Sequence, residues 1–145
     1  MGLLSPPILD SDFVSQLIPQ KWPMVLVDRL LSFSNEQIVS GFQIPEENLF
    51  VRNGLFEAPG IIEHMAQTVA LYTGYKYYLL DKTPPTGYIG AIKKAEISQV
   101  PKAGEELVTT VNVLHDIMGV TLVTAKVECN GNLVGRSEMK TVLAK

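Results

Sequence analysis

The sequence predicts an α+β fold in which an antiparallel sheet wraps around one long helix, and three observations support this. One apolar segment, starting at Pro59, keeps three- and four-residue spacing for longer than most helices of small domains. Two strand-like runs precede this segment and four follow it, with turn-forming residues between them. The 145 residues suffice for one core and are too few for two ordinary ones. We therefore expect a single domain over residues 1–145.

A short helix and a pair of strands are expected ahead of the long helix. The run SDFVSQLI begins at Ser11, and either Ser11 or Asp12 is the expected N-cap. β-Branched and aliphatic residues in Met24–Ser34 and Gln37–Ile44 predict two strands. The next stretch, residues 45–58, has little periodicity, so a long loop is expected there.

The long helix is expected to run for about 22 residues, from Pro59 to Leu80. Pro59 suits a first helical position because its missing N–H would have had no partner there. A helix of this length spans ~33 Å at 1.5 Å per residue. Because apolar residues occupy most of its faces, the helix should be buried.

Four strand-like segments complete the chain, in residues 87–98, 106–117, 119–130 and 132–144. The turn formers PKAG, MG and NGN separate them. One helix covers only one face of such a sheet, so the other face or an edge should meet a partner. We expect a homodimer.

Composition and charge exclude several classes of function. The net charge of −3 and a pI near 5.3 leave no basic excess for nucleic-acid binding. The single cysteine, Cys129, rules out an internal disulfide and a cysteine-rich metal site. No run reaches the ~20 apolar residues of a membrane helix, and no secretory signal pattern is present. We expect a cytoplasmic protein without membrane contact, metal or cofactor.

Two motifs, in this order and at this spacing, resemble the β-hydroxyacyl-acyl carrier protein dehydratases of the hot-dog fold. The first is PQKWPMVLVDR, Pro19–Arg29, and the second is the E-x-M-A-Q stretch Glu63–Gln67. The resemblance extends from about Leu17 to Leu143. It implies a hot-dog fold and a lyase of fatty-acid or polyene-type biosynthesis. Its substrate would be a 3-hydroxyacyl thioester carried by acyl carrier protein or coenzyme A.

The resemblance also assigns roles to single positions. In that family a helix carboxyl group protonates or orients the departing hydroxyl, and a histidine of the other subunit removes the α-proton. The carboxyl group falls on Glu63, and the backbone donor for the thioester carbonyl falls on Ala58. The family's catalytic histidine falls on Leu49, and a second histidine of its N-terminal motif falls on Gln20. Both expected imidazoles are therefore missing.

Glu63 is the leading catalytic candidate. A glutamate in the first turn of a helix gains ~0.3–1 kcal/mol from the helix dipole. A carboxylate among apolar residues of a buried helix is nevertheless costly unless it is paired or functional. Gln67 lies one turn later, where it can hydrogen-bond the carboxylate and hold its rotamer. The substrate-binding candidates are Phe50, Ala58, Gly60 and Gln67.

Two histidines are candidates for the missing base. His64 follows Glu63, but adjacent helical residues point about 100° apart, so the two cannot face one groove squarely. The simpler interpretation of His64 is a polar residue at the helix flank or dimer seam. His115, beside Asp116 at a strand end, is typical of a surface or turn residue.

Three functions fit these residues. The first is a dehydratase-like enzyme, which the order of the motifs favours. The second is an acyl thioesterase in which Glu63 acts as nucleophile or general base. The third is a non-catalytic acyl-binding subunit that completes a related subunit in a mixed dimer, which the leucine at position 49 favours.

Overall fold

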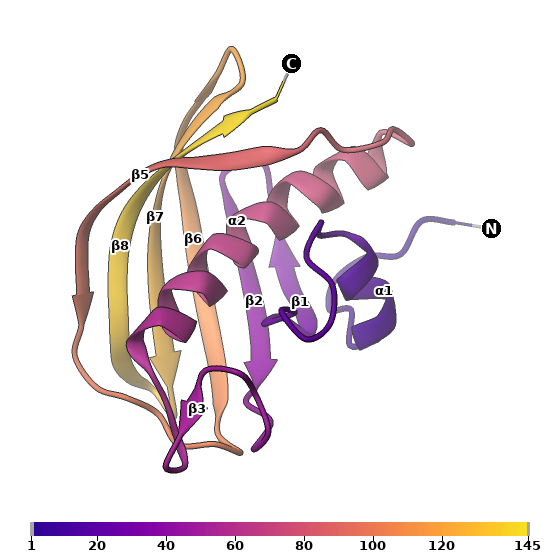
Figure 1. Cartoon of the computed structure of the whole chain (residues 1–145). Coiled ribbons are helices and arrows are strands. Elements are labelled where there is room, and N and C mark those ends of the chain that lie inside the picture. The colour runs from indigo at the N-terminus through magenta and orange to yellow at the C-terminus, as the bar shows by residue number, and fades with distance from the viewer. Residues whose placement is uncertain (1, 145) are drawn as a thin grey trace.

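The structure, a computed structural model, describes residues 2–144 and shows one long helix lying across the concave face of a curved sheet (Figure 1). The strands of this sheet are β1 (Arg29–Phe33), β2 (Gln37–Gln43), β5 (Gly87–Ile97), β6 (Glu106–Ile117), β7 (Val120–Cys129) and β8 (Asn132–Leu143). They run antiparallel in the spatial order β1-β2-β6-β7-β8-β5. The predicted antiparallel sheet around one helix is confirmed.

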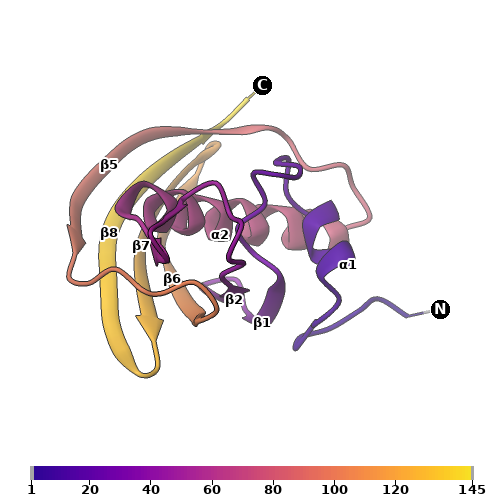
Figure 2. The ribbon, with the colours of Figure 1, turned by 60° about the horizontal axis from the view of Figure 1, so that its bottom comes forward.

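The central helix α2 (Ala58–Leu79) has 22 residues, the predicted length, and begins one residue before Pro59. Its buried faces pack on the concave side of the sheet, which encloses the helix in Figure 2. In the middle of α2, between residues 60 and 74, four small or polar residues are only half-buried: Glu63, Ala66, Ala70 and Thr73. Among residues 2–144, no helix is long and apolar enough to cross a membrane.

The first strand is shorter than predicted, because β1 begins at Arg29 and not at Met24. The backbone of the preceding residues bonds to side chains of α2. Met24 O accepts from Gln67, Leu26 N–H donates to Gln67, and Leu26 O bonds to His64. The sequence of this segment is strand-like, but its backbone bonds to the polar side chains Gln67 and His64 of the helix instead of to a neighbouring strand.

The region between β2 and α2 contains a small hairpin where a loop was expected. Its strands are β3 (Val51–Arg52) and β4 (Leu55–Phe56). Asn53 and Gly54 join them with positive φ angles of 53° and 76°. Both residue types tolerate this region of backbone conformation, and Asn-Gly is the preferred pair for such a turn.

The short N-terminal helix α1 (Ser11–Gln16) is present, but its cap differs from the prediction. Asp10 is the N-cap, and its carboxylate accepts hydrogen bonds from the N–H groups of Asp12 and Phe13. Ser11 and Asp12 lie inside the helix, so the expected cap was one or two residues too late.

The two edges of the large sheet differ. Ile8 exchanges two backbone hydrogen bonds with Leu30 of β1, at 2.7 and 3.0 Å, so the N-terminal segment blocks the middle of that edge. At the opposite edge, β5 has no further strand beside it within residues 2–144. Its residues Tyr88, Ile89 and Ile92 are 62%, 43% and 43% exposed. An exposed apolar edge strand is a template for pairing with another chain.

The end of α1 lies directly on α2 at Gly74. A Cβ at position 74 would lie 1.8 Å from the carbonyl oxygen of Leu17. Two tyrosine hydroxyls fix the chain nearby, since Tyr75 donates to Leu4 O and Tyr78 accepts from Leu4 N–H. The N-terminal residues therefore form a fixed wall beside α2.

Gly74→Ala is expected to destabilise the protein by about 1–3 kcal/mol or more, because the new Cβ meets a backbone carbonyl that no rotamer change can avoid. In an unobstructed helix the same substitution would stabilise by up to about 1 kcal/mol. Urea unfolding followed by circular dichroism measures the difference. Gly87→Ala is the control, since its nearest non-local atom would lie 3.5 Å from the added Cβ. A Gly74→Ala variant as stable as the wild type would contradict the described packing.

Candidate active site

A pocket of about 290 Å³ runs along the uncovered stripe of α2. The helix lines the pocket with Glu63, Ala66, Ala70 and Thr73, among others. From residue 63 to residue 73 the helix rises ~15 Å at 1.5 Å per residue. Residues 16–20, residues 84–89 and the end of β8 supply the other walls. Glu63 is the only acidic residue on these walls among residues 2–144. The pocket fits an extended apolar ligand, one end of which would lie against the carboxyl group of Glu63.

The carboxylate of Glu63 is held by Gln67. The Gln67 amide nitrogen donates to Glu63 Oε2 at 2.9 Å and to Met24 O at 2.6 Å. The Gln67 amide oxygen accepts from Leu26 N–H at 2.6 Å. The predicted hydrogen bond between Glu63 and Gln67 is confirmed. Glu63 Oε1 has no partner among the described residues, so one carboxyl oxygen is available to a reacting group.

The start of α2 offers a backbone donor one turn before Glu63. Glu57 is the N-cap, and its carbonyl accepts from Gly60 N–H at 2.9 Å. The N–H of Ala58 has no acceptor among the described residues, and Pro59 has no N–H. A free N–H at the positive end of a helix dipole can bind a carbonyl oxygen on which negative charge develops.

The other predicted substrate contacts, Gly60 and Phe50, take part in packing. A Cβ on Gly60 would lie 2.6 Å from Phe50 Cβ and 2.8 Å from the Phe56 ring. Phe50 and Phe56 meet edge to face with their ring centroids 6.5 Å apart. Neither Gly60 nor Phe50 lines the pocket, and Ala58 does not line it either. The close packing explains why glycine stands at position 60.

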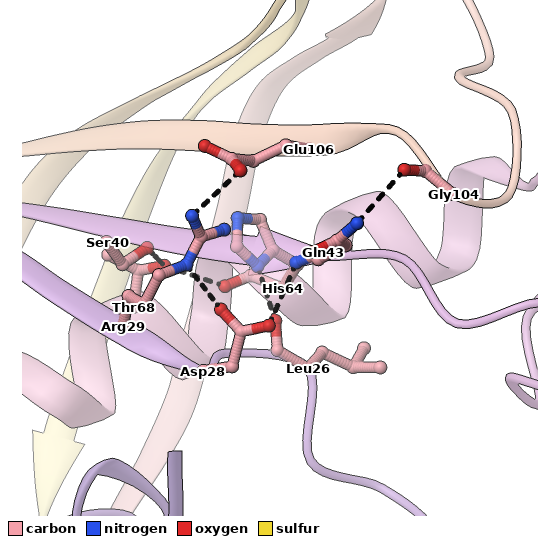
Figure 3. A network of polar contacts seen from close by, with 9 residues as sticks. All are labelled: Leu26, Asp28, Arg29, Ser40, Gln43, His64, Thr68, Gly104 and Glu106. Atoms are coloured by element: carbon pink, nitrogen blue, oxygen red, sulfur yellow. Dashed lines mark hydrogen bonds and ion pairs between the residues drawn. The ribbon is translucent and has the colours of Figure 1, made fainter. Parts of the chain in front are cut away.

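His64 lies in the interior of the molecule, beside the polar residues labelled in Figure 3, and it does not line the pocket. The ring is 0% exposed, and its nitrogens lie 2.7 Å from Leu26 O and 2.7 Å from Thr109 Oγ1. Because a carbonyl only accepts, Nδ1–H donates to Leu26 and Nε2 accepts from the Thr109 hydroxyl. Both nitrogens are therefore engaged, and the geometry lends no support to a catalytic His64.

Burial lowers the pKa of His64 from 6.5 to about 4. The hydrogen bond to the Leu26 carbonyl and the charge of Asp28 oppose this shift but do not overcome it. The imidazole is neutral at neutral pH. It joins α2 to the segment before β1 and to β6.

A charged network in Figure 3 lies beside His64 and ties β1 to β2 and β6. Arg29 bonds to Asp28 at 2.9 Å and to Glu106 at 2.8 Å. Asp28 also accepts from the backbone N–H of Gln43 at 3.0 Å. This network braces the sheet edge and does not reach the pocket wall.

Neither remaining candidate position provides a base to the pocket. His115 is exposed on β6, next to Asp116, whose carboxylate binds Lys76 at 3.0 Å. Leu49 is 58% exposed just before β3. No histidine lines the pocket among residues 2–144. Within the described residues, the site therefore holds a positioned carboxyl group and no imidazole.

Sequence reasoning missed most of the pocket wall. Small residues recur at four-residue spacing on one side of α2, which otherwise carries large side chains, and this was the available signal. The remaining walls come from segments distant in sequence. The missed lining residues include Leu17, Ala66, Ala70, Thr73, Gly74, Pro85, Tyr88, Ile89, Thr141 and Leu143.

The chain is similar to several known proteins. The family model for ApeP-like proteins, described as ApeP dehydratase, matches residues 13–144. A 3-hydroxyacyl-[acyl-carrier-protein] dehydratase FabZ from Latilactobacillus sakei is 32% identical over 136 residues, which cover 83% of this chain and 90% of that protein. The FabZ of Aliivibrio fischeri is 26% identical over 133 residues, 88% of each chain.

A solved structure has the same fold. The dehydratase heterocomplex ApeI:P from Xenorhabdus doucetiae matches with a TM-score of 0.85, over 91% of each chain. The sequence identity is 17%, so this likeness concerns the fold alone.

The pKa of His64 makes stability depend on pH. The unfolded chain binds a proton near pH 6.5 and the folded chain only near pH 4, so the contribution is complete above 6.5 and lost as pH falls toward 4. The full shift is worth roughly 3 kcal/mol. Denaturant unfolding between pH 4 and 7 should show a shallower slope for His64→Gln. His115→Gln, which changes the chain's only other histidine, should match the wild type. Equal slopes in all three proteins would contradict this account.

Proposed function

This chain belongs to the ApeP-like dehydratase family, and we propose that it supplies the acid, but not the base, for removing water from a 3-hydroxyacyl thioester of acyl carrier protein. One observation carries the proposal: Glu63, held by Gln67, ends an apolar pocket whose walls contain no histidine within residues 2–144. The FabZ relatives, named as dehydratases of 3-hydroxyacyl chains on acyl carrier protein, support the substrate class.

In the proposed reaction the acyl chain lies along α2 with its 3-hydroxyl near Glu63 Oε1. A base removes a proton from C2 while the Glu63 carboxyl group gives its proton to the hydroxyl. Water leaves, and a C2–C3 double bond forms. We propose that the thioester carbonyl lies outside the pocket walls, at the start of α2, where the free N–H of Ala58 stabilises the negative charge that develops.

We propose that the base comes from a second subunit that pairs at the open edge β5. The exposed residues Tyr88, Ile89 and Ile92 support pairing there, and the first two also line the pocket. A homodimer would carry Leu49 at both base positions. The similar Xenorhabdus doucetiae protein is part of a dehydratase heterocomplex, which favours a mixed dimer here as well. Coenzyme A as an alternative carrier and a cytoplasmic location stay predictions.

Glu63→Gln is expected to reduce dehydration at least about 100-fold, because general acid catalysis contributes that much or more. The assay combines the chain with a histidine-bearing subunit of the same family and follows double-bond formation and free thiol from 3-hydroxyacyl thioesters of acyl carrier protein. Glu128→Gln is the control, since Glu128 lies on β7 outside the pocket. Thiol release that depends on Glu63 would instead indicate an acyl thioesterase. Turnover of no thioester would leave an acyl-binding subunit.

Leu49→His is expected to give the isolated chain measurable dehydration activity, because it restores an imidazole at the family's base position in a self-pair. The exposed side chain makes the substitution tolerable. Leu55→His, in the neighbouring strand β4 and also exposed, is the matched control and should stay inactive. Adding Glu63→Gln should abolish the gain. An inactive Leu49→His chain that light scattering shows to be a dimer would contradict a base at this position.

A further inference from the structure

Gln20 is a polar residue of the pocket that the acid and its support do not use. It lines the same pocket as Glu63. Its amide oxygen is buried and accepts no hydrogen bond from any residue of the described chain. Folded proteins rarely leave a buried acceptor without a donor, because the group loses its hydration and gains nothing in return. Within residues 2–144 this oxygen therefore has no donor, and a ligand in the pocket can supply one only if the amide turns toward the pocket.

The backbone around Gln20 is fixed on both sides. The ammonium group of Lys21 donates to the carbonyls of Ser15 and Ile18, at 3.1 and 3.0 Å. Four residues after Gln20, Met24 O accepts from Gln67, the residue that also holds Glu63. The backbone that follows Gln20 and the carboxylate of Glu63 are thus held by the same side chain, Gln67.

The amide of Gln20 is free to turn either of its polar atoms toward the pocket. No donor holds its oxygen inward, and the terminal torsion of glutamine is broad. An amide offers both a donor and an acceptor, which is also what a hydroxyl group offers. On the acyl part of a 3-hydroxyacyl thioester, the hydroxyl is the only hydrogen-bond donor.

We propose that Gln20 is a positioning residue for the substrate's 3-hydroxyl, an inference that rests on the proposed function. The amide oxygen accepts the hydroxyl hydrogen, so a lone pair of the hydroxyl oxygen stays free to take the proton of Glu63. After water leaves, the unsaturated product has no such donor and loses this contact. Gln20 therefore makes the pocket prefer substrate over product.

The test measures binding and needs no turnover. The protein is the complex of this chain with a histidine-bearing subunit of the same family. Isothermal titration calorimetry would compare its affinities for two unreactive acyl amides of pantetheine. The two acyl chains have equal length, and one is 3-hydroxylated while the other is saturated and unsubstituted. The wild type should bind the 3-hydroxylated ligand about three- to tenfold more tightly, the value of one hydrogen bond. Gln20→Leu should bind both ligands equally, with its affinity for the saturated ligand unchanged. Gln43→Leu, an exposed glutamine outside the pocket, should keep the wild-type preference.

The outcomes separate this inference from the proposed function. Equal affinities in the wild type, or a preference that survives in Gln20→Leu, would overturn the role of Gln20. The Glu63-dependent dehydration would be untouched by either result. Failure of the wild-type complex to bind either ligand would overturn both proposals together.

Discussion

The three hydrogen bonds of Gln67 are the interaction on which the arrangement of the site depends. The side chain is 0% exposed, so each of its polar atoms must find a partner inside the protein. It finds them in the backbone of Met24 and Leu26 and in the carboxylate of Glu63. One buried amide therefore holds an extended segment against α2 and sets the rotamer of the acid.

The same requirement fixes how α2 sits in the sheet. His64 bonds to Thr109 of β6, and Thr68 shares a 2.8 Å hydrogen bond with Ser40 of β2. Sliding or rotating the helix would separate these buried pairs and leave polar atoms without partners. An entirely apolar helix would be buried as well, but it could pack against the sheet in several orientations of similar free energy. The polar residues on α2 select one of them.

Local pattern made much of the fold predictable, and long-range contacts account for the rest. The spacing of apolar residues gave the length of α2, and alternation with turn formers gave the strands that follow it. Met24–Leu26 has a strand-like composition, yet its backbone forms hydrogen bonds with side chains about forty positions later in the sequence and not with a neighbouring strand. The bond between Glu63 and Gln67 was predictable because it joins positions one helical turn apart. The orphaned oxygen of Gln20 depends on the folded surroundings and has no local signal.

The difference between the two sheet edges limits how this chain can assemble. Ile8 pairs with Leu30 at the β1 edge, whereas within residues 2–144 no strand or bridge lies beyond β5, so β5 is the more open edge for pairing. A filament needs two open edges on every chain, whereas one open edge permits only a closed pair. Under the proposed pairing at β5, each chain takes a single neighbour along the sheet, and a homodimer removes two chains from mixed dimers. Under the proposed division of labour, the relative amounts of the two subunits set the fraction of complete active sites in the cell.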